Sequence, residues 1–108
     1  MRRFALAVLM LGAAAWPGLA QEDDARLVRG RALAAEMCAA CHAIGPSDQG
    51  PHRDAPPFRT LERRVDLDAF LDRLRQGLTS GHPDMPTFRF TRDDARALIA
   101  YLRSIQQP

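Results

Sequence analysis

Lysine is absent from this chain and cysteine is scarce. The 108 residues include two cysteines, and all fifteen basic residues are arginines. The two cysteines form a single Cys-x-x-Cys pair, whereas a structural zinc site usually takes its ligands from two such pairs. The chain also lacks a basic run and an aromatic platform interleaved with it, which excludes a typical nucleic-acid-binding surface.

A hydrophobic run long enough to span a membrane is also missing. The apolar stretch Phe4–Trp16 has about thirteen residues, short of the roughly twenty that a membrane-spanning helix needs. Two arginines precede it, and residues 18–20 place small side chains at positions −3 and −1 of a cleavage site. We therefore predict that residues 1–20 are a cleaved signal peptide and residues 21–108 the mature domain. An uncleaved anchor is the alternative.

The charge of the mature domain gives no indication of an oppositely charged partner. The full chain carries a formal charge of +2, but Arg2 and Arg3 belong to the predicted signal peptide. Without them, thirteen arginines balance thirteen aspartates and glutamates. A chain of this size forms one domain with a small hydrophobic core.

The sequence Cys38-Ala39-Ala40-Cys41-His42 carries the strongest functional signal. On a helical turn, positions i, i+3 and i+4 share a face, so both thiols and the imidazole can reach one ligand. This spacing is the attachment motif of c-type haem, in which the thiols bind the vinyl groups and the histidine binds the iron. We predict one covalently attached haem c, bound through Cys38 and Cys41, with His42 as an axial ligand.

Two other uses of the cysteine pair are less favoured. A thioredoxin-like dithiol follows a strand in a βαβ unit, and no strand pattern precedes Cys38. A disulfide between Cys38 and Cys41 would close a loop too short to add much stability.

Met85 is the predicted second axial ligand of the iron. It lies in a short proline-rich segment, where Pro86 biases it toward an extended backbone that can hold the thioether against a metal. His82 and His52 compete for the same role. His52 is expected to be solvated, and His82 is expected at the surface or beside the site. Met37 lies on the first helix next to Cys38 and is expected on the wrong side of the haem.

Three helices separated by irregular loops predict an all-α domain. The first begins near Asp23 or Asp24, the second is capped by Asp66 and stopped by Gly77, and the third is capped by Thr91. The loops 43–57 and 79–90 are rich in proline and glycine, and a short helical turn is expected after the first of them.

Further expectations concern the faces of these elements. Gly30 on the first helix predicts a close crossing by another helix. Asp94 is expected to complete a capping box with the third helix's cap. Arg59 is a candidate to neutralise a haem propionate. The predicted apolar pocket consists of Leu61, Phe70, Leu74, Phe88 and Leu98.

The chain resembles class I cytochromes c, in particular small periplasmic cytochromes of alphaproteobacteria. The resemblance rests on the haem motif, the Met85-Pro86 dipeptide, the last helix, and Gly30 with Tyr101, which match the glycine and the aromatic residue at that family's helix crossing. It implies the cytochrome c fold, with three main helices around one haem. It also implies one-electron transfer in the periplasm between a redox protein donor and acceptor, without enzymatic activity.

The resemblance implies a monomer or a weakly docked subunit, and no stable membrane insertion of the mature chain. Two alternative functions stay open. The first is a haem enzyme or ligand-binding sensor with a displaceable sixth ligand. The second is an electron-entry subunit of a larger oxidoreductase.

Overall fold

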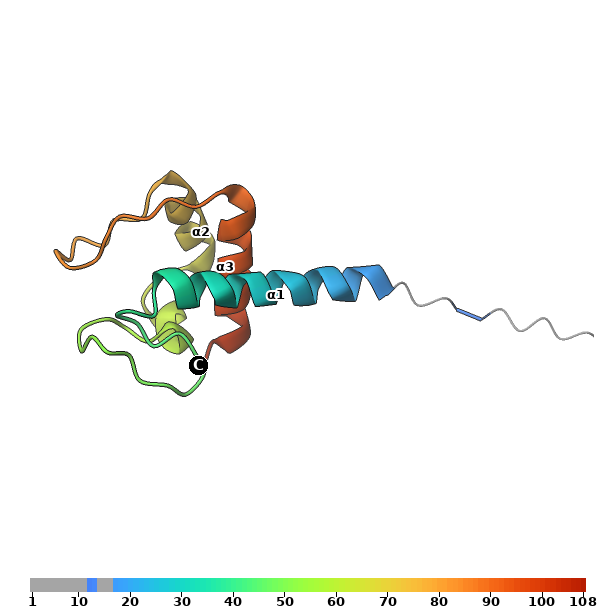
Figure 1. Ribbon diagram of the computed structural model, residues 1–108, viewed down its shortest axis with the longest axis horizontal. Coiled ribbons are helices and arrows are strands. Elements are labelled where there is room, and N and C mark those ends of the chain that lie inside the picture. The colour runs from blue at the N-terminus through green and yellow to red at the C-terminus, as the bar shows by residue number, and fades with distance from the viewer. Residues whose placement is uncertain (1–11, 14–16) are drawn as a thin grey trace, which may run out of the picture.

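The computed structural model describes residues 12–13 and 17–108. Among these residues it has three α-helices, one 3-10 helix and no strand, which confirms the all-α prediction (Figure 1). Leu78 and Phe88 form an isolated antiparallel bridge. The elements in chain order are α1 (Pro17–Met37), η1 (Phe58–Arg63), α2 (Leu67–Gln76) and α3 (Arg92–Ile105).

Helix α1 begins at Pro17, before the predicted start at Asp23 or Asp24. Proline is favoured at the first helical position, and no further proline interrupts the segment up to Met37, so the helix extends through the acidic residues expected to cap it. The predicted cleavage point after Ala20 therefore lies inside α1. Most of the predicted signal peptide, residues 1–11 and 14–16, lies outside the described residues, and its cleavage stays a prediction.

Helices α1 and α3 cross (Figure 1). Gly30 lies at this crossing, as the sequence predicts. A Cβ atom on this buried glycine would lie 2.0 Å from the carbonyl oxygen of Ala97 and 2.7 Å from the Cβ of Tyr101. The two helix backbones can approach this closely only because Gly30 has no side chain.

An ion pair also joins α1 and α3 at this crossing, and it contradicts one prediction about the start of α3. The Arg29 guanidinium donates to both carboxylate oxygens of Asp94, at 3.0 and 3.1 Å. The Thr91 hydroxyl accepts from the backbone N–H of Asp94 at 3.2 Å, so Thr91 caps α3 as predicted. The Asp94 carboxylate, however, contacts α1 and does not complete a capping box. The sequence could not show this because the partner is far away in the chain.

The ends of α2 follow the sequence prediction. The Asp66 carboxylate accepts from the backbone N–H of Ala69 at 2.9 Å. Gly77 ends the helix with a φ of +121°, a conformation that residues with a Cβ rarely adopt. Leu67 and Leu74 of α2 are buried and face α3, so both α1 and α2 pack against the last helix.

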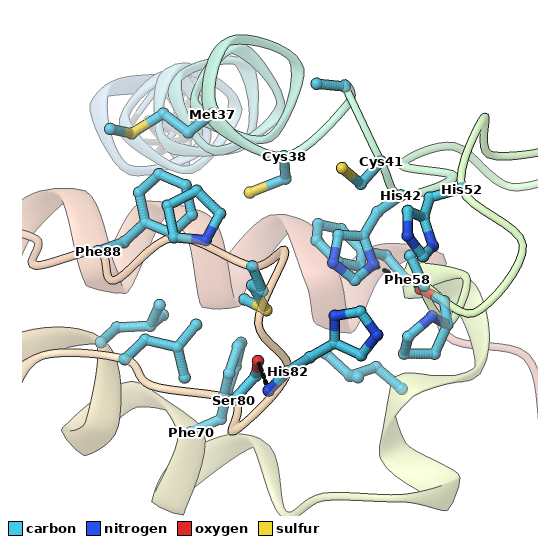
Figure 2. A pocket seen from close by; sticks show the side chains of 18 of the residues that line it. Met37, Cys38, Cys41, His42, His52, Phe58, Phe70, Ser80, His82 and Phe88 are labelled. Carbon is cyan, nitrogen blue, oxygen red and sulfur yellow. Dashed lines mark hydrogen bonds between the residues drawn. The ribbon is translucent and has the colours of Figure 1, made fainter.

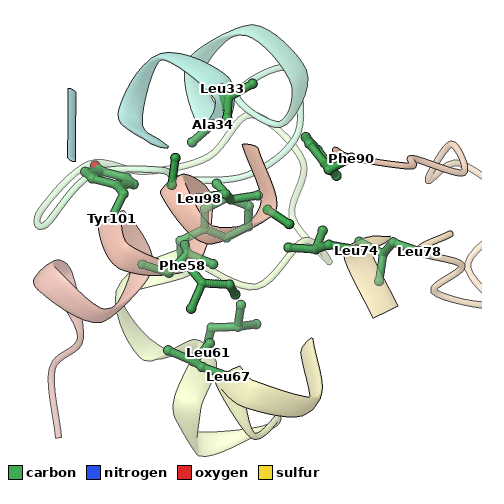
Figure 3. Close-up of a cluster of buried hydrophobic side chains, with 14 residues drawn as sticks. Leu33, Ala34, Phe58, Leu61, Leu67, Leu74, Leu78, Phe90, Leu98 and Tyr101 are labelled. Atoms are coloured by element: carbon green, nitrogen blue, oxygen red, sulfur yellow. The ribbon is translucent and has the colours of Figure 1, made fainter. Parts of the chain in front are cut away.

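The hydrophobic core lies between α3 and the elements around it (Figure 3). Its most buried large side chains are Leu74, Leu98 and Leu102. The last helix presents an apolar stripe to this core, since Ala95, Leu98, Ile99 and Leu102 are all buried there. Leu33 and Ala34 contribute the buried face of α1.

Candidate functional site

A cavity of about 380 Å³ opens between the end of α1, η1, α2, α3 and the loop 79–90 (Figure 2). Its volume falls in the usual range for cofactor sites, and most of its lining is apolar. All five residues predicted for the pocket line it: Leu61, Phe70, Leu74, Phe88 and Leu98. Val65, Leu78 and Phe90 also line it. The sequence did not predict these three residues because their positions depend on the three-dimensional path of the loops.

Both cysteine sulfurs face this cavity (Figure 2). The helical path continues briefly beyond α1, since the backbone N–H groups of Cys41 and His42 both donate to the carbonyl of Cys38, at 3.2 and 2.9 Å. The two thiols are free and half-buried. The motif therefore presents its three functional side chains to one space, as the spacing predicts.

Burial raises the pKa of the Cys38 thiol to about 11, so the group is protonated at neutral pH. A dithiol that performs redox exchange needs a thiolate with a lowered pKa. The environment of Cys38 does not suit that role, whereas it suits a sulfur held against an apolar ligand.

The imidazole of His42 is oriented by a backbone carbonyl. Its Nδ1 lies 2.8 Å from the carbonyl oxygen of Pro56. A carbonyl only accepts, so Nδ1 must donate its proton, and Nε2 keeps the lone pair that a metal would bind. The His42 ring also packs against Phe58, with ring centroids 4.8 Å apart. Sequence reasoning missed Pro56 as a partner because the contact crosses the whole loop 43–57.

Side chains at and just after the end of α3 donate hydrogen bonds to the chain on both sides of the loop around His42. The Tyr101 hydroxyl donates to the carbonyl of Ile44 at 2.6 Å, and burial raises the pKa of that hydroxyl. The Gln107 amide donates to the carbonyl of Pro46 at 2.7 Å. The Gln106 amide donates to the carbonyl of Phe58 at 2.6 Å. These residues tie α3 to both sides of the loop around the imidazole.

Gln106→Ala is expected to destabilise the protein by about 1–3 kcal/mol. Besides Phe58, the Gln106 side chain bonds the carbonyl of Leu102 at 2.8 Å and accepts from the N–H of Glu62 at 3.0 Å. In the alanine variant these partly buried backbone groups lose their hydrogen-bond partner. Guanidinium unfolding measures the change, with exposed Gln76→Ala as the matched control, expected within about 0.5 kcal/mol of wild type. Equal losses in both variants would contradict a bracing role for Gln106.

Met85 lines the cavity from the loop 79–87. The bridge between Leu78 and Phe88 closes this loop at its base, with N–H···O distances of 2.7 and 3.3 Å. Met85 is half-buried and packs against the core. Met37 also lines the cavity, from the end of α1, but its side chain is 37% exposed. Of the two methionines, Met85 is the more buried residue.

One expectation about a polar residue is wrong. His52, expected to be solvated, is half-buried and lines the cavity beside His82. Its backbone N–H donates to the carbonyl of Cys41 at 3.1 Å, which draws the loop 43–57 back toward the haem motif. Arg59 lies outside the cavity lining and donates to the carbonyl of Asp48 at 2.7 Å, and its contact with a haem propionate stays a prediction. Arg73 from α2 lines the cavity, and sequence reasoning missed it.

His82 is exposed at the mouth of the cavity, as expected for a residue at the surface or beside the site. The cavity lining carries two thiols, the imidazoles of His42, His52 and His82, and the thioethers of Met37 and Met85, among mostly apolar side chains. Two thiols and a neighbouring imidazole on an apolar cavity fit a macrocycle that is attached through two sulfurs and carries a metal.

Comparison with known proteins agrees with this geometry. Residues 25–102 match the family described as cytochrome C oxidase, cbb3-type, subunit III. Cytochrome c-552 of Bradyrhizobium diazoefficiens is 32% identical over 77 residues, which cover 71% of this chain and 72% of that protein. The chain belongs to this family and is a small class I c-type cytochrome with the all-α cytochrome c fold.

The cofactor of this family is covalently bound haem c, and the protein is an electron-transfer haem protein. Among the residues that the structure describes, none of the helices is both long enough and apolar enough to span a membrane.

Proposed function

We propose that the protein is a periplasmic monohaem cytochrome c that transfers single electrons through a His/Met-ligated haem. Cys38 and Cys41 form the two thioether bonds, and His42 and Met85 are the axial ligands. The observation that carries this proposal is the bond from His42 Nδ1 to Pro56, which leaves Nε2 available beside both thiols. Met85 lines the same apolar cavity and supplies the second ligand.

When bound, the haem supplies a one-electron Fe(III)/Fe(II) couple. The side chains of the protein set the conditions for that couple. The Pro56 carbonyl and the Phe58 ring fix the orientation of the His42 imidazole. The loop 79–87 holds the Met85 thioether in place, and the apolar lining excludes water. His42 and Met85 would bind the iron in both oxidation states, so little in the protein would need to rearrange between them.

Location and partners follow from the same proposal. The charged start, short apolar stretch and small residues of segment 1–20 support export to the periplasm. The partners are a redox protein donor and acceptor, and the chain itself is a carrier and not an enzyme. The near balance of charge in residues 21–108 suits brief encounters with such proteins.

Protein isolated from the periplasm should carry the mass of one haem in addition to residues 21–108. Cys38→Ser with Cys41→Ser removes both attachment sulfurs, so its haem should be lost on denaturation. Intact mass and pyridine-haemochrome spectra measure both results. Ala39→Ser, between the two cysteines, is the matched control and should keep its haem. A wild-type chain without added porphyrin would refute the proposal.

The matched family description favours one second candidate, an electron-entry subunit of a larger oxidoreductase. Chromatography of the same haem-loaded material under native conditions distinguishes the two. Elution at the mass of one chain supports the free carrier. Co-elution with a larger assembly supports the subunit.

A further inference from the structure

Two segments of the sequence form the same local structure beside the cavity. They are His52-Arg53-Asp54 and His82-Pro83-Asp84. In each, the backbone N–H of the aspartate donates to Nδ1 of the histidine two residues earlier, at 3.2 Å. Each bond fixes the direction of its imidazole ring, because Nδ1 is the acceptor and Nε2 points away from its own turn.

The two turns meet at the cavity. The rings of His52 and His82 contact each other edge to face, with centroids 5.6 Å apart and planes at 87° (Figure 2). The Nε2 atom of His52 lies 3.7 Å from a carboxylate oxygen of Asp84. All three residues line the cavity mouth. The contact joins the loop 43–57 to the loop that carries Met85.

The tip of the Met85 loop, residues 80–86, makes few other hydrogen bonds or ion pairs with the rest of the protein. The bridge between Leu78 and Phe88 holds its base, and Arg73 donates to the carbonyl of Thr79 at 3.2 Å. Hydrogen bonds made by residues 80–86 stay within the tip. Within residues 12–13 and 17–108, two such contacts join this tip to another segment. They are the ring contact of His82 with His52 and the ion pair of Asp84 with His52.

His52 itself is well anchored. Its backbone N–H donates to the carbonyl of Cys41, within the haem motif, and its side chain is 32% exposed. A contact from His52 to the tip therefore connects Met85 to the segment that carries His42. Met85 would be held on the inner side by the iron and on the outer side by this contact.

We propose that His52 is a positioning residue that keeps Met85 on the iron by holding His82 and Asp84 at the cavity mouth. This inference rests on the proposed function. Without the contact, the loop opens more often, and an external ligand competes more successfully for the vacated position. The ring contact dominates, because Asp84 is 71% exposed and exposed ion pairs contribute little.

Imidazole binding to the ferric, haem-loaded protein tests this role. His52→Ala should bind imidazole about three- to tenfold more tightly than wild type, since an edge-to-face pair contributes about that factor. Arg53→Ala, a change at the exposed neighbouring residue, is the matched control and should stay within about twofold. His52→Phe keeps a ring facing His82 and should restore most of the wild-type affinity. Titration of the visible spectrum measures each constant.

Amide hydrogen exchange gives a readout that does not depend on the ligands of the iron. His52→Ala should speed exchange in residues 80–86 and leave α3 unchanged. Unchanged imidazole affinity together with unchanged exchange would overturn the proposal, as would equal effects in Arg53→Ala. If the wild-type ferric spectrum lacks the signature of Met ligation while exchange still responds to His52→Ala, Met85 ligation fails but the contact across the mouth stands.

Discussion

Met85→Ala is expected to abolish the weak long-wavelength charge-transfer band that Met-ligated ferric haem shows. It should also lower the reduction potential by roughly 100 mV or more, within the ~0.8 V that axial ligation spans. The thioether favours the ferrous state, so replacing it with water or another ligand stabilises the ferric state. Visible spectroscopy and a redox titration measure the two changes.

The chain offers one matched control for this experiment and one test of the competing ligand. Met37→Ala removes the other methionine of the cavity and should leave the band and the potential unchanged. His82→Ala removes the competing ligand from the same loop. An unchanged spectrum and potential in Met85→Ala would show that Met85 is not the ligand, and a large change in His82→Ala alone would assign the histidine.

Gly30→Ala is expected to destabilise the folded protein by about 2 kcal/mol and to lower its melting temperature by roughly 10 °C. The new Cβ would lie 2.0 Å from the Ala97 carbonyl oxygen, so α1 and α3 must move apart. Overpacking of this kind costs about 3 kcal/mol, and alanine returns only about 1 kcal/mol of helix propensity. Thermal and guanidinium unfolding of the haem-loaded protein measure the loss.

Ala32→Ser is the matched control on the same helix. It also adds one heavy atom, but on an exposed side of α1, and should change stability by less than about 0.5 kcal/mol. If Gly30→Ala is as stable as Ala32→Ser, the helices do not need the glycine to approach.

Features that depend on neighbouring residues were predictable from the sequence. The spacing of Cys38, Cys41 and His42 follows from helical geometry, and the structure places all three on one cavity. The caps at Asp66 and Thr91 and the stop at Gly77 involve partners within a few residues. The bulk of the pocket was predictable as well, because large apolar side chains of a small domain have few other places to pack.

Features that depend on distant partners were not predictable. The sequence gives no sign that Asp94 meets Arg29 in place of its own helix cap. His52 looks solvated in a polar loop, yet its backbone bond to Cys41 brings it to the cavity mouth. The orientation of Arg59 is set by Asp48 across a turn. The roles of the haem-binding residues and the cleavage of residues 1–20 stay predictions.

The brace formed by Tyr101, Gln106 and Gln107 has a consequence for biogenesis. These residues follow the segment that they hold in the chain. If the chain is exported from its N-terminus, as proposed, Cys38 and Cys41 would emerge before α3, and haem attachment could precede closure by the last helix. A premature stop codon ahead of α3 would leave a product able to accept its porphyrin but unable to enclose it.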